Sequence, residues 1–331
     1  MISIIIPAYN AAETLPDCLA GLKAQTLGPA DYEIIIVDDG STDQTAQLAH
    51  QAGVRVVSQA NGGAAAARNY GAQIAQGELL LFTDADCIPT PNWAAAMSAP
   101  FTDPTIAGAK GAYRTKQAEL TARFVQLEYQ DKYDRMAGLA AIDFVDTYSA
   151  AYRREVFLAL GGFDTTFPGA SVEDQEFSFR LTEAGHRLVF VPQAIVWHRH
   201  DRTVAEYARR KYFIGYWKPL VVQRHPTKLI RDSHTPQVLK GQMGLAALGA
   251  GLISLGPLLR QPAISAWGLL AWLLLLLSGL SFYQKIARQD RPVLLLAPWL
   301  LFVRAWALGL GFAVGQVQLV LMKRLKLERP R

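Results

Sequence analysis

The chain has 331 residues, enough for one large domain and a second structural part, and its net charge of +5 is distributed unevenly. Residues 1–198 carry 13 Lys and Arg against 23 Asp and Glu, residues 199–240 carry 10 against 3, and residues 241–331 carry 10 against 2. The basic residues adjoin apolar segments, so the pattern favours a membrane surface and argues against a nucleic-acid partner. Cys18 and Cys87 show no CxxC spacing and no matching histidine cluster, so neither a disulfide scaffold nor a zinc site is indicated.

The first 99 residues alternate short β-rich runs with helical stretches. The apolar run after Met1 lacks a basic region before it and ends at Pro7, so it predicts a first strand and no secretory signal. Helices are predicted over residues 12–25, 42–52 and 64–76, and further strands at YEIIIVDD, VRVV and LLLF. Apolar strands separated by helices are typical of a parallel sheet covered on both faces, which predicts an α/β fold.

Polar residues follow each of these four predicted strands. They are Tyr9 and Asn10, Asp38 and Asp39, Asn61, and Asp84 and Asp86. Parallel sheets bind their ligands outside the carboxyl ends of the strands. Because core packing does not explain polar residues at all four ends, the sequence predicts a ligand site at this edge of the sheet.

The part of the chain from residue 106 to residue 198 is less regular. Strands are predicted at IAGAKGAY, TYSAAYR and RLVFVPQAIVW, and helices over residues 118–136 and 154–160. The second helix stops at Gly161 and Gly162, because glycine commonly ends helices. We therefore expect one domain over residues 1–200.

A basic, aromatic-rich helix is predicted over residues 203–220, just before the apolar segments. Its composition is typical of a helix lying in the membrane interface, and an ordinary surface helix is the alternative. We therefore expect a basic amphipathic interfacial region over residues 201–240. A transmembrane region follows over residues 241–331.

Three apolar segments, residues 243–259, 263–283 and 293–322, make up the expected transmembrane region. The second is the surest span, since a bilayer core needs about 20 apolar residues. The acidic residues 1–198 and the basic residues that follow the third apolar segment are both expected on the cytosolic side. Three plain crossings would place the tail outside. We therefore expect residues 293–322 to form a bent or re-entrant pair about Pro298 and Arg304.

Asp84 and Asp86 are the first candidates for chemistry. Residues two apart on an extended segment point to the same side, so both carboxylates could hold one hard cation such as Mg²⁺ or Mn²⁺. The alternative is turn chemistry, in which the aspartates accept hydrogen bonds from nearby backbone amides before Pro89.

The stretch VEDQEFSFRL places Glu173 and Asp174 at the start of a predicted helix. Their structural interpretation is that acidic residues in a first turn favour the helix dipole, while Glu176 and Arg180 form an i,i+4 pair. Their functional interpretation is a carboxylate that accepts a proton from a substrate.

Six stretches in order decide between these interpretations. They are IPAYNAAETL, VDDGSTDQT, NGGAAAARNYG, FTDAD, AAYRREVFLALGGFD and VEDQEFSFRL. Residues 1–198 thereby resemble glycosyltransferase family 2, inverting enzymes of the GT-A fold. The resemblance implies a mostly parallel sheet flanked by helices, and a sugar transferred from a nucleotide donor with a divalent metal, Mg²⁺ or Mn²⁺.

The resemblance also assigns roles to individual residues. The nucleoside pocket is expected at Pro7, Ala8, Tyr9, Asn10 and Asp39, with Arg68 on the nucleotide, Asp84 near the ribose or diphosphate, Asp86 and His198 on the metal, Asp174 as base and Glu173 as supporting carboxylate. Asp84 is also a candidate metal ligand. Alternatives stay open: Asp43 fits helix capping, Asp38 orients a loop, Arg68 is a surface residue, and His198 is solvated or interfacial.

The expected protein is a multi-pass enzyme of the cytoplasmic membrane with its catalytic domain in the cytosol. It would take a nucleotide sugar, a UDP-sugar first, and pass the sugar to a lipid-linked or membrane-proximal glycan acceptor. The Q-x-x-R-W signature of processive synthases is missing from ARRKYFIGYW, which favours one sugar per encounter. The alternatives are a nucleotidyltransferase on a similar fold and a catalytically idle membrane-bound scaffold. A dinucleotide oxidoreductase lacks its G-x-G-x-x-G motif.

Overall fold

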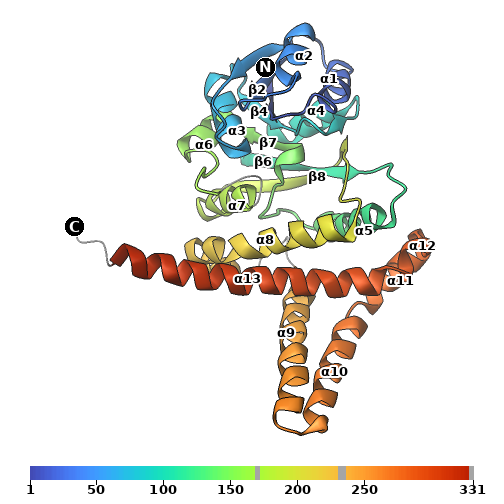
Figure 1. Cartoon of the computed structure of the whole chain (residues 1–331). Coiled ribbons are helices and arrows are strands. Elements are labelled where there is room, and N and C mark those ends of the chain that lie inside the picture. Colours follow the sequence, from blue (N-terminus) through green and yellow to red (C-terminus); the bar gives the residue numbers. More distant parts are fainter. Residues whose placement is uncertain (168–171, 230–235, 328–331) are drawn as a thin grey trace. The chain divides into compact units, whose positions relative to one another are not determined.

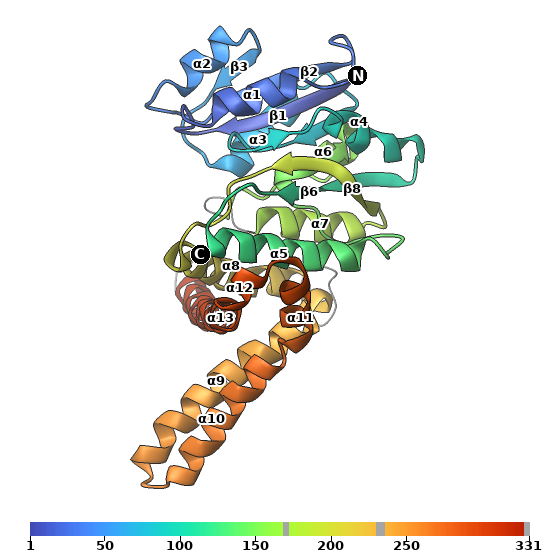
Figure 2. The same ribbon diagram turned by 90° about the vertical axis from the view of Figure 1, so that its right-hand side faces the viewer.

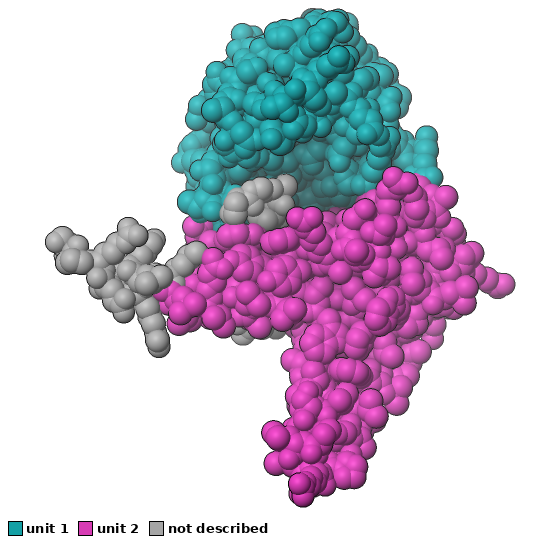
Figure 3. All heavy atoms as spheres, viewed as in Figure 1, with its two compact units in different colours: residues 1–116, 132–199 teal, residues 117–131, 200–331 magenta. Residues whose placement is uncertain are grey.

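The computed structural model describes residues 1–167, 172–229 and 236–327, with side chains up to residue 321. These residues form two compact units, coloured separately in Figure 3. The first unit holds residues 1–116 and 132–199, and the second holds residues 117–131 and 200–331. Parts of the expected interfacial region and basic tail, residues 230–235 and 328–331, lie outside the described residues.

The first unit is built on an eight-stranded sheet with the order β3-β2-β1-β4-β7-β6-β8-β5 (Figure 1). Its strands are β1 (Ile2–Ala8), β2 (Tyr32–Asp38), β3 (Arg55–Ser58), β4 (Leu79–Phe82), β5 (Ile88–Pro89), β6 (Ile106–Arg114), β7 (Ala150–Arg153) and β8 (Arg187–Trp197). The first four strands are parallel, and β7 and β5 run antiparallel to their neighbours. The prediction of a mostly parallel α/β sheet is confirmed.

Helices connect these strands, most of them close to the predicted positions. They are α1 (Leu15–Lys23), α2 (Thr45–Gln51), α3 (Ala64–Ile74), α4 (Trp93–Ser98), α6 (Arg154–Ala159) and α7 (Glu173–Glu183). Against the sheet, five aromatic rings from β4, β7, α6, α7 and the segment between the helices pack with centroids 4.9–6.3 Å apart: Phe82, Tyr152, Phe157, Phe163 and Phe177. Edge-to-face contacts of this kind fix the relative positions of α6, α7 and the sheet.

The second unit is helical. It contains α8 (Val204–Arg224), α9 (Gln237–Leu258), α10 (Pro262–Leu277), α11 (Leu280–Gln289), α12 (Arg291–Leu294) and α13 (Ala297–Leu327), and it takes in residues 120–131 of α5 (Leu120–Met136). Phe124 and Val125 of α5 are buried in one cluster with Tyr207 of α8 and Leu300 of α13. The apolar face of α5 therefore belongs to the core of the helical unit.

Helices α8 and α13 lie side by side, and α9 and α10 form a hairpin that runs away from this pair (Figures 1 and 2). Glycines allow the close approach of α8 and α13. A Cβ on Gly311 or Gly315 would collide with the backbone carbonyl oxygen of Tyr212 or Tyr216, respectively. This small-xxx-small spacing is the usual device by which helix backbones come together in membrane proteins.

The predictions for the apolar segments need correction. Residues 293–322 do not form a bent or re-entrant pair, because α13 is one helix of 31 residues. Pro298 lies in its first turn, where the missing N–H breaks no helix hydrogen bond. Residues 263–283, the span expected to be surest, are divided into α10 and α11, which are bent by 42°. By length and composition, α9 and Ala297–Leu321 could each cross a membrane, and α10 with α11 could be a third span.

A buried ionic cluster explains why Arg304 does not break α13. Its Nη1 donates to Oε1 of Glu128 on α5 at 2.5 Å, and its Nη2 donates to Oε1 of Gln242 on α9 at 2.9 Å. Glu128 also accepts from the Tyr207 hydroxyl at 3.0 Å and pairs with Lys211 at 3.0 Å, both on α8. Buried charges require such partners. This cluster ties four helices of the unit together.

Candidate active site

The carboxyl ends of β1 and β2 carry loops that are hydrogen-bonded to each other. Asn10, with a positive φ of 48°, accepts from the backbone of Thr42 at 2.8 Å, and its own N–H donates to the Ser41 hydroxyl at 2.9 Å. Pro7 and Ala8 are buried in β1, whereas Tyr9 is 53% exposed beside Asn10. The expected nucleoside-binding residues therefore form a fixed rim with one exposed aromatic ring.

Asp39 organises the next loop along this rim. Its carboxylate is almost fully buried and accepts from the Gln59 amide at 2.7 Å and from the backbone N–H groups of Gly62 and Gly63 at 2.8 Å each. Asp38 accepts from the backbone of Ser41 at 3.1 Å. Both aspartates thus hold loops in place, although the sequence suggested that role only for Asp38.

Arg68 lies at the centre of the site and is buried, with its side chain 2% exposed. Its Nη2 donates to Oδ1 of Asp84 at 2.6 Å, and its Nη1 donates to Oε1 of Glu173 at 3.3 Å. The surface interpretation of Arg68 is therefore wrong. The guanidinium links the end of β4 to the start of α7, which are about ninety residues apart in sequence.

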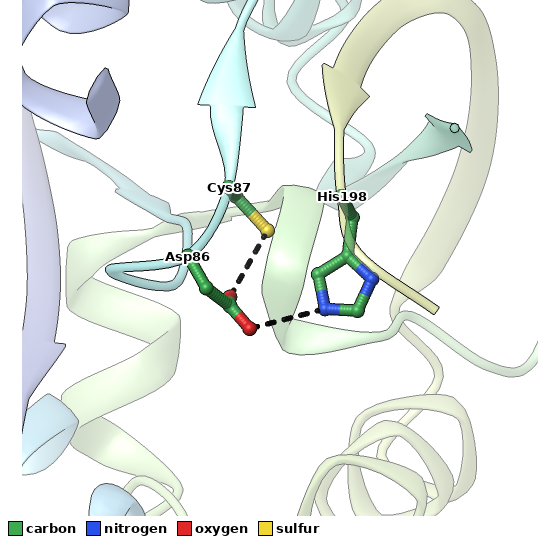
Figure 4. Close-up of side chains that lie close together, drawn as sticks. All are labelled: Asp86, Cys87 and His198. Carbon is green, nitrogen blue, oxygen red and sulfur yellow. Dashed lines mark hydrogen bonds and ion pairs between the residues drawn. The ribbon is translucent and has the colours of Figure 1, made fainter. Parts of the chain in front are cut away.

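Asp86 and His198 form a second contact within the site, and Figure 4 shows them with Cys87. The Nε2 atom of His198 lies 3.3 Å from Oδ2 of Asp86, and the Cys87 thiol donates to Oδ1 at 3.7 Å. Burial disfavours ionisation of Asp86, but the hydrogen bond and charge of His198 outweigh it, so the pKa of Asp86 is lowered. The carboxylate is thus charged at neutral pH.

Strand pairing brings these two residues together. The short strand β5 follows Cys87 directly and pairs with the end of β8, with Ile88 opposite Trp197. His198 is the next residue after β8, and its backbone N–H donates to the carbonyl of Arg114 at 2.9 Å. The ring of Tyr113 stacks on the imidazole at 4.6 Å. The imidazole is therefore held over Asp86 by the sheet and is not a solvated side chain.

The two aspartates of D-x-D face different partners. Strand β4 ends at Phe82, and Asp84 and Asp86 lie in a turn closed by the backbone bond from Cys87 to the Asp84 carbonyl at 3.0 Å. Because this segment is a turn and not an extended strand, the two side chains do not point to the same side. Asp84 contacts Arg68, and Asp86 contacts His198. Among the residues that the structure describes, the group close enough to share a metal ion is Asp86, Cys87 and His198, with ligand atoms within 4.8 Å of one another.

Cys87 is the member of this group that the sequence did not single out. Its thiol is fully buried, and burial raises its pKa well above the usual range, with the charges of Asp86 and Asp84 adding to the effect. The thiol is therefore neutral and donates to Asp86. The adjacency of cysteine to the D-x-D was the signal available in the sequence.

Asp174 stands one residue after Glu173, in the first turn of α7. Burial raises the pKa of its carboxyl to about 7, and the neighbouring Glu173 carboxylate acts in the same direction. The backbone N–H of Gln175, which donates at 2.7 Å, and the cations Arg68 and Lys110 oppose this rise. A carboxyl with such a pKa can exchange a proton near neutral pH, which is what a general base requires.

The site residues named from the sequence thus fall into two linked groups in the first unit. Arg68, Asp84 and Glu173 form one group, with Asp174 beside it, and Asp86 forms the other with His198. His200, two residues after His198, belongs to the second unit, where its ring stacks on Tyr129 at 5.5 Å.

Proteins of similar sequence include glycosyltransferases. The chain is 26% identical over 230 residues to Glycosyltransferase AglE of Haloferax volcanii, covering 65% of this chain and 71% of that protein. It is 28% identical over 265 residues to Pre-mycofactocin glycosyltransferase of Mycobacterium tuberculosis, covering 76% of this chain and 53% of that protein. It spans about half of the latter's length.

A solved structure shows the same fold. Mannosyltransferase PcManGT from Pyrobaculum calidifontis, in complex with GDP-Man and Mn²⁺, superposes with a TM-score of 0.57 at 20% identity, covering 97% of this chain and 87% of that chain. The sheet, its polar rim and these likenesses define a glycosyltransferase of the GT-A fold. Residues 3–161 match the model of Glycosyl transferase family 2.

The role of Arg68 can be tested through stability. Arg68→Met leaves two carboxylates without their counter-charge, and Glu173 is almost fully buried, so we expect the free energy of unfolding to fall by about 3–5 kcal/mol. Chemical unfolding of the detergent-solubilised protein, followed by tryptophan fluorescence, measures this loss.

Arg154→Met is the matched control, because Arg154 donates to the backbone carbonyls of Ala72 and Gln73 and not to carboxylates. We expect this variant to lose only about 1 kcal/mol of unfolding free energy. Equal losses of unfolding free energy in the two variants would mean that the link from Asp84 to Glu173 stabilises the protein no more than ordinary hydrogen bonds to backbone carbonyls do.

Proposed function

We propose that this protein transfers a sugar from a nucleotide-sugar donor to a lipid-linked or membrane-proximal acceptor, with inversion at the anomeric carbon and one sugar per encounter. The observation that carries the proposal is the placing of Asp86 with His198, and of Asp174 beside Arg68, within one site at the strand ends. The match of residues 3–161 to the model of Glycosyl transferase family 2 supports the reaction class, and the GDP-Man complex of PcManGT supports a nucleotide sugar as donor.

A divalent metal fits the residues at Asp86. A carboxylate suits Mg²⁺ and Mn²⁺, and an imidazole is a better ligand for Mn²⁺ than for Mg²⁺. Asp86 and His198 would hold the ion, and the Cys87 thiol orients the Asp86 carboxylate. When bound, the metal neutralises the charge of a departing diphosphate. Because Asp84 is occupied by Arg68, we assign it to shaping the site and not to the first contact with the metal.

The proton is handled by Asp174. In an inverting displacement the acceptor hydroxyl attacks the anomeric carbon from the side opposite the diphosphate, and one carboxylate takes its proton. Asp174 is positioned at the start of α7, and its raised pKa matches this task. Glu173 is engaged by Arg68 and acts as the supporting carboxylate.

The donor would lie along the strand ends. The nucleoside is expected against the rim of Pro7, Ala8, Tyr9 and Asn10, where the exposed Tyr9 ring offers a stacking surface. Asp39 contributes by holding the loop of Gly62 and Gly63, which leads into α3 and so to Arg68. A UDP-sugar is the first donor to test, and a GDP-sugar is the second.

The reaction type is tested by its products. We expect membranes that contain the protein to release nucleoside diphosphate from one of a panel of nucleotide sugars when Mn²⁺ or Mg²⁺ is present. Asp86→Ala should lower this release at least about 100-fold, since it removes the carboxylate that holds the metal. Release of pyrophosphate would show a nucleotidyltransferase, and failure to bind any nucleotide sugar would show an idle binding protein.

Asp174→Asn separates catalysis from binding. We expect it to abolish transfer while the affinity for donor, measured by calorimetry with metal present, stays within about twofold, because an amide cannot take the proton. In the unaltered protein kcat/KM should fall as the pH drops below about 7, the pKa of Asp174. Full activity of the variant would remove Asp174 as the base.

We further propose that the catalytic domain is cytosolic and that the α9–α10 hairpin enters the cytoplasmic membrane while α8 and α13 lie along its surface. The hairpin exposes Leu258, Trp267, Leu269 and Leu273, which is typical of lipid contact. Helix α13 lies beside α8 and runs across the direction of the α9–α10 hairpin (Figure 1). Helix α13 and the hairpin therefore cannot both run perpendicular to the membrane plane. Two of the basic residues of α8, Arg210 and Lys211, pair inside the unit with Asp201 and Glu128.

This topology places the hairpin tip and the chain end on opposite sides. We expect a reporter fused after Arg331 to score as cytosolic, and Arg260→Cys at the tip to react with an impermeant maleimide from outside. Cys18 and Cys87 are buried, and Arg291→Cys serves as the control for the cytosolic side. An external reporter would instead make α13 a true crossing.

A further inference from the structure

A buried thiol lies beside the two residues that are proposed to hold a hard metal ion. The Cys87 thiol donates to Oδ1 of Asp86 at 3.7 Å, and Nε2 of His198 lies 3.3 Å from Oδ2 of the same carboxylate (Figure 4). One ligand atom from each of the three side chains lies within 4.8 Å of the other two. The proposed reaction uses the thiol only as a hydrogen-bond donor, so its capacity as a ligand is unassigned.

The separations within this group match those of ligands around a tetrahedral ion. With Zn–S distances of about 2.3 Å and Zn–N and Zn–O distances of about 2.0–2.1 Å, the ligand atoms of a tetrahedral zinc ion lie about 3.3–3.6 Å apart. The contacts of Asp86 with His198 and Cys87, at 3.3 and 3.7 Å, are close to these values. They involve different oxygens of Asp86, so a small rotation of the carboxylate lets one oxygen serve as the ligand.

The sheet holds the three side chains together. Cys87 directly precedes β5, whose Ile88 pairs with Trp197 of β8, and His198 directly follows β8. The stacked ring of Tyr113 fixes the imidazole. Strand pairing and not a local motif assembles the group, which is why the spacing of the cysteines in the sequence did not indicate a zinc site. Ligands carried by rigid elements in this way are positioned before an ion binds.

The order in which an ion meets these ligands follows from their exposure. The side chains of Asp86 and His198 are 44% and 19% exposed, whereas Cys87 is fully buried. An ion from solvent therefore reaches the carboxylate and the imidazole first and the sulfur last. Mg²⁺ and Mn²⁺ prefer oxygen and nitrogen ligands, whereas the softer ions Zn²⁺ and Cd²⁺ also bind thiolate and displace the thiol proton. The thiol thus distinguishes between these two classes of ion.

We propose that Asp86, Cys87 and His198 form a three-ligand site for thiophilic divalent ions, Zn²⁺ and Cd²⁺, and that an ion bound there inhibits the enzyme; only the inhibition rests on the proposed function. The ion replaces the proton of the Cys87 thiol, and the proton passes to water. Two anionic ligands then cancel the two positive charges of the ion. A hard ion on Asp86 and a neutral imidazole keeps one net positive charge for a departing diphosphate, which the thiolate-bound ion does not.

Cadmium absorption tests the thiol as a ligand without turnover. We expect Cd²⁺ added to the detergent-solubilised protein to produce the ultraviolet charge-transfer band of a Cd–thiolate bond. Cys87→Ser should abolish this band and lower the affinity for Zn²⁺, measured by competition with a chromophoric chelator, at least about 100-fold, since loss of even an outer partner of a metal ligand costs about 10–100-fold. The affinity for Mn²⁺, measured by electron paramagnetic resonance, should change less than about threefold, because Mn²⁺ does not use the thiol.

Cys18→Ser is the matched control, because the chain has two cysteines and both are buried and free. The Cys18 thiol donates to the backbone carbonyl of Asp84 at 3.6 Å and lies outside the three-ligand group. This variant should keep the band and the affinity for Zn²⁺. A band that persists in Cys87→Ser, or that is lost in Cys18→Ser, would overturn the site.

A measurement on the protein with Cys87 intact covers the case in which Cys87→Ser does not fold, which thermal unfolding without metal reveals. X-ray absorption at the zinc edge of Cys18→Ser should show one sulfur at about 2.3 Å together with nitrogen and oxygen ligands. A shell of nitrogen and oxygen alone would reject the thiol as a ligand.

The inhibition is tested by release of nucleoside diphosphate in the presence of Mn²⁺. We expect Zn²⁺ or Cd²⁺ to lower this release and dithiothreitol, which removes these ions, to restore it. Each variant is compared with its own rate without added Zn²⁺, and the inhibiting concentration should rise at least about tenfold in Cys87→Ser. An undiminished rate with the site loaded would overturn the inhibition. A band that depends on Cys87 in a protein that transfers no sugar would support the site and reject only the proposed function.

Discussion

The buried guanidinium of Arg68 is the constraint on which the site depends. It joins Asp84, at the end of β4, to Glu173, at the start of α7, and so connects the half of the sheet expected to hold the donor with the helix that carries the proposed base. Carboxylates at these two places would repel each other without it. The distance between the end of β4 and the start of α7 is therefore set by a planar, permanently charged group, which a lysine could not replace in the same geometry.

A second constraint is the pairing of β5 with β8. It carries His198 to Asp86 across a long stretch of sequence, while the stacked ring of Tyr113 fixes the imidazole. Each half of the proposed site thus has its own anchor, the Arg68 guanidinium on one side and the His198 imidazole on the other. Loops alone would position these groups less accurately than strands and helix starts do.

Local pattern was enough to predict the first four parallel strands, and the structure places polar residues at the carboxyl ends of β1 and β2 in loops that are hydrogen-bonded to each other. It was not enough to predict the partners of buried charges, because those partners lie on distant segments. Arg68 was open to a surface interpretation, since folding alone brings Glu173 to it. Arg304 in an apolar segment predicted a break, but Glu128 of α5 and Gln242 of α9 satisfy it, and the helix continues. The partners of buried charged residues are therefore the contacts that are hardest to predict from a single sequence.

Helix α5 has a practical consequence for handling the protein. Residues 120–131 of this helix belong to the helical unit and residues 132–136 to the sheet unit, so the chain passes between the units at three places. A fragment cut near residue 200 to obtain a soluble enzyme would leave Phe124, Val125 and Leu127 without α8 and α13 to cover them. Such a fragment would present an apolar helix face to water and aggregate, so soluble expression calls for redesign of that face and not simple truncation.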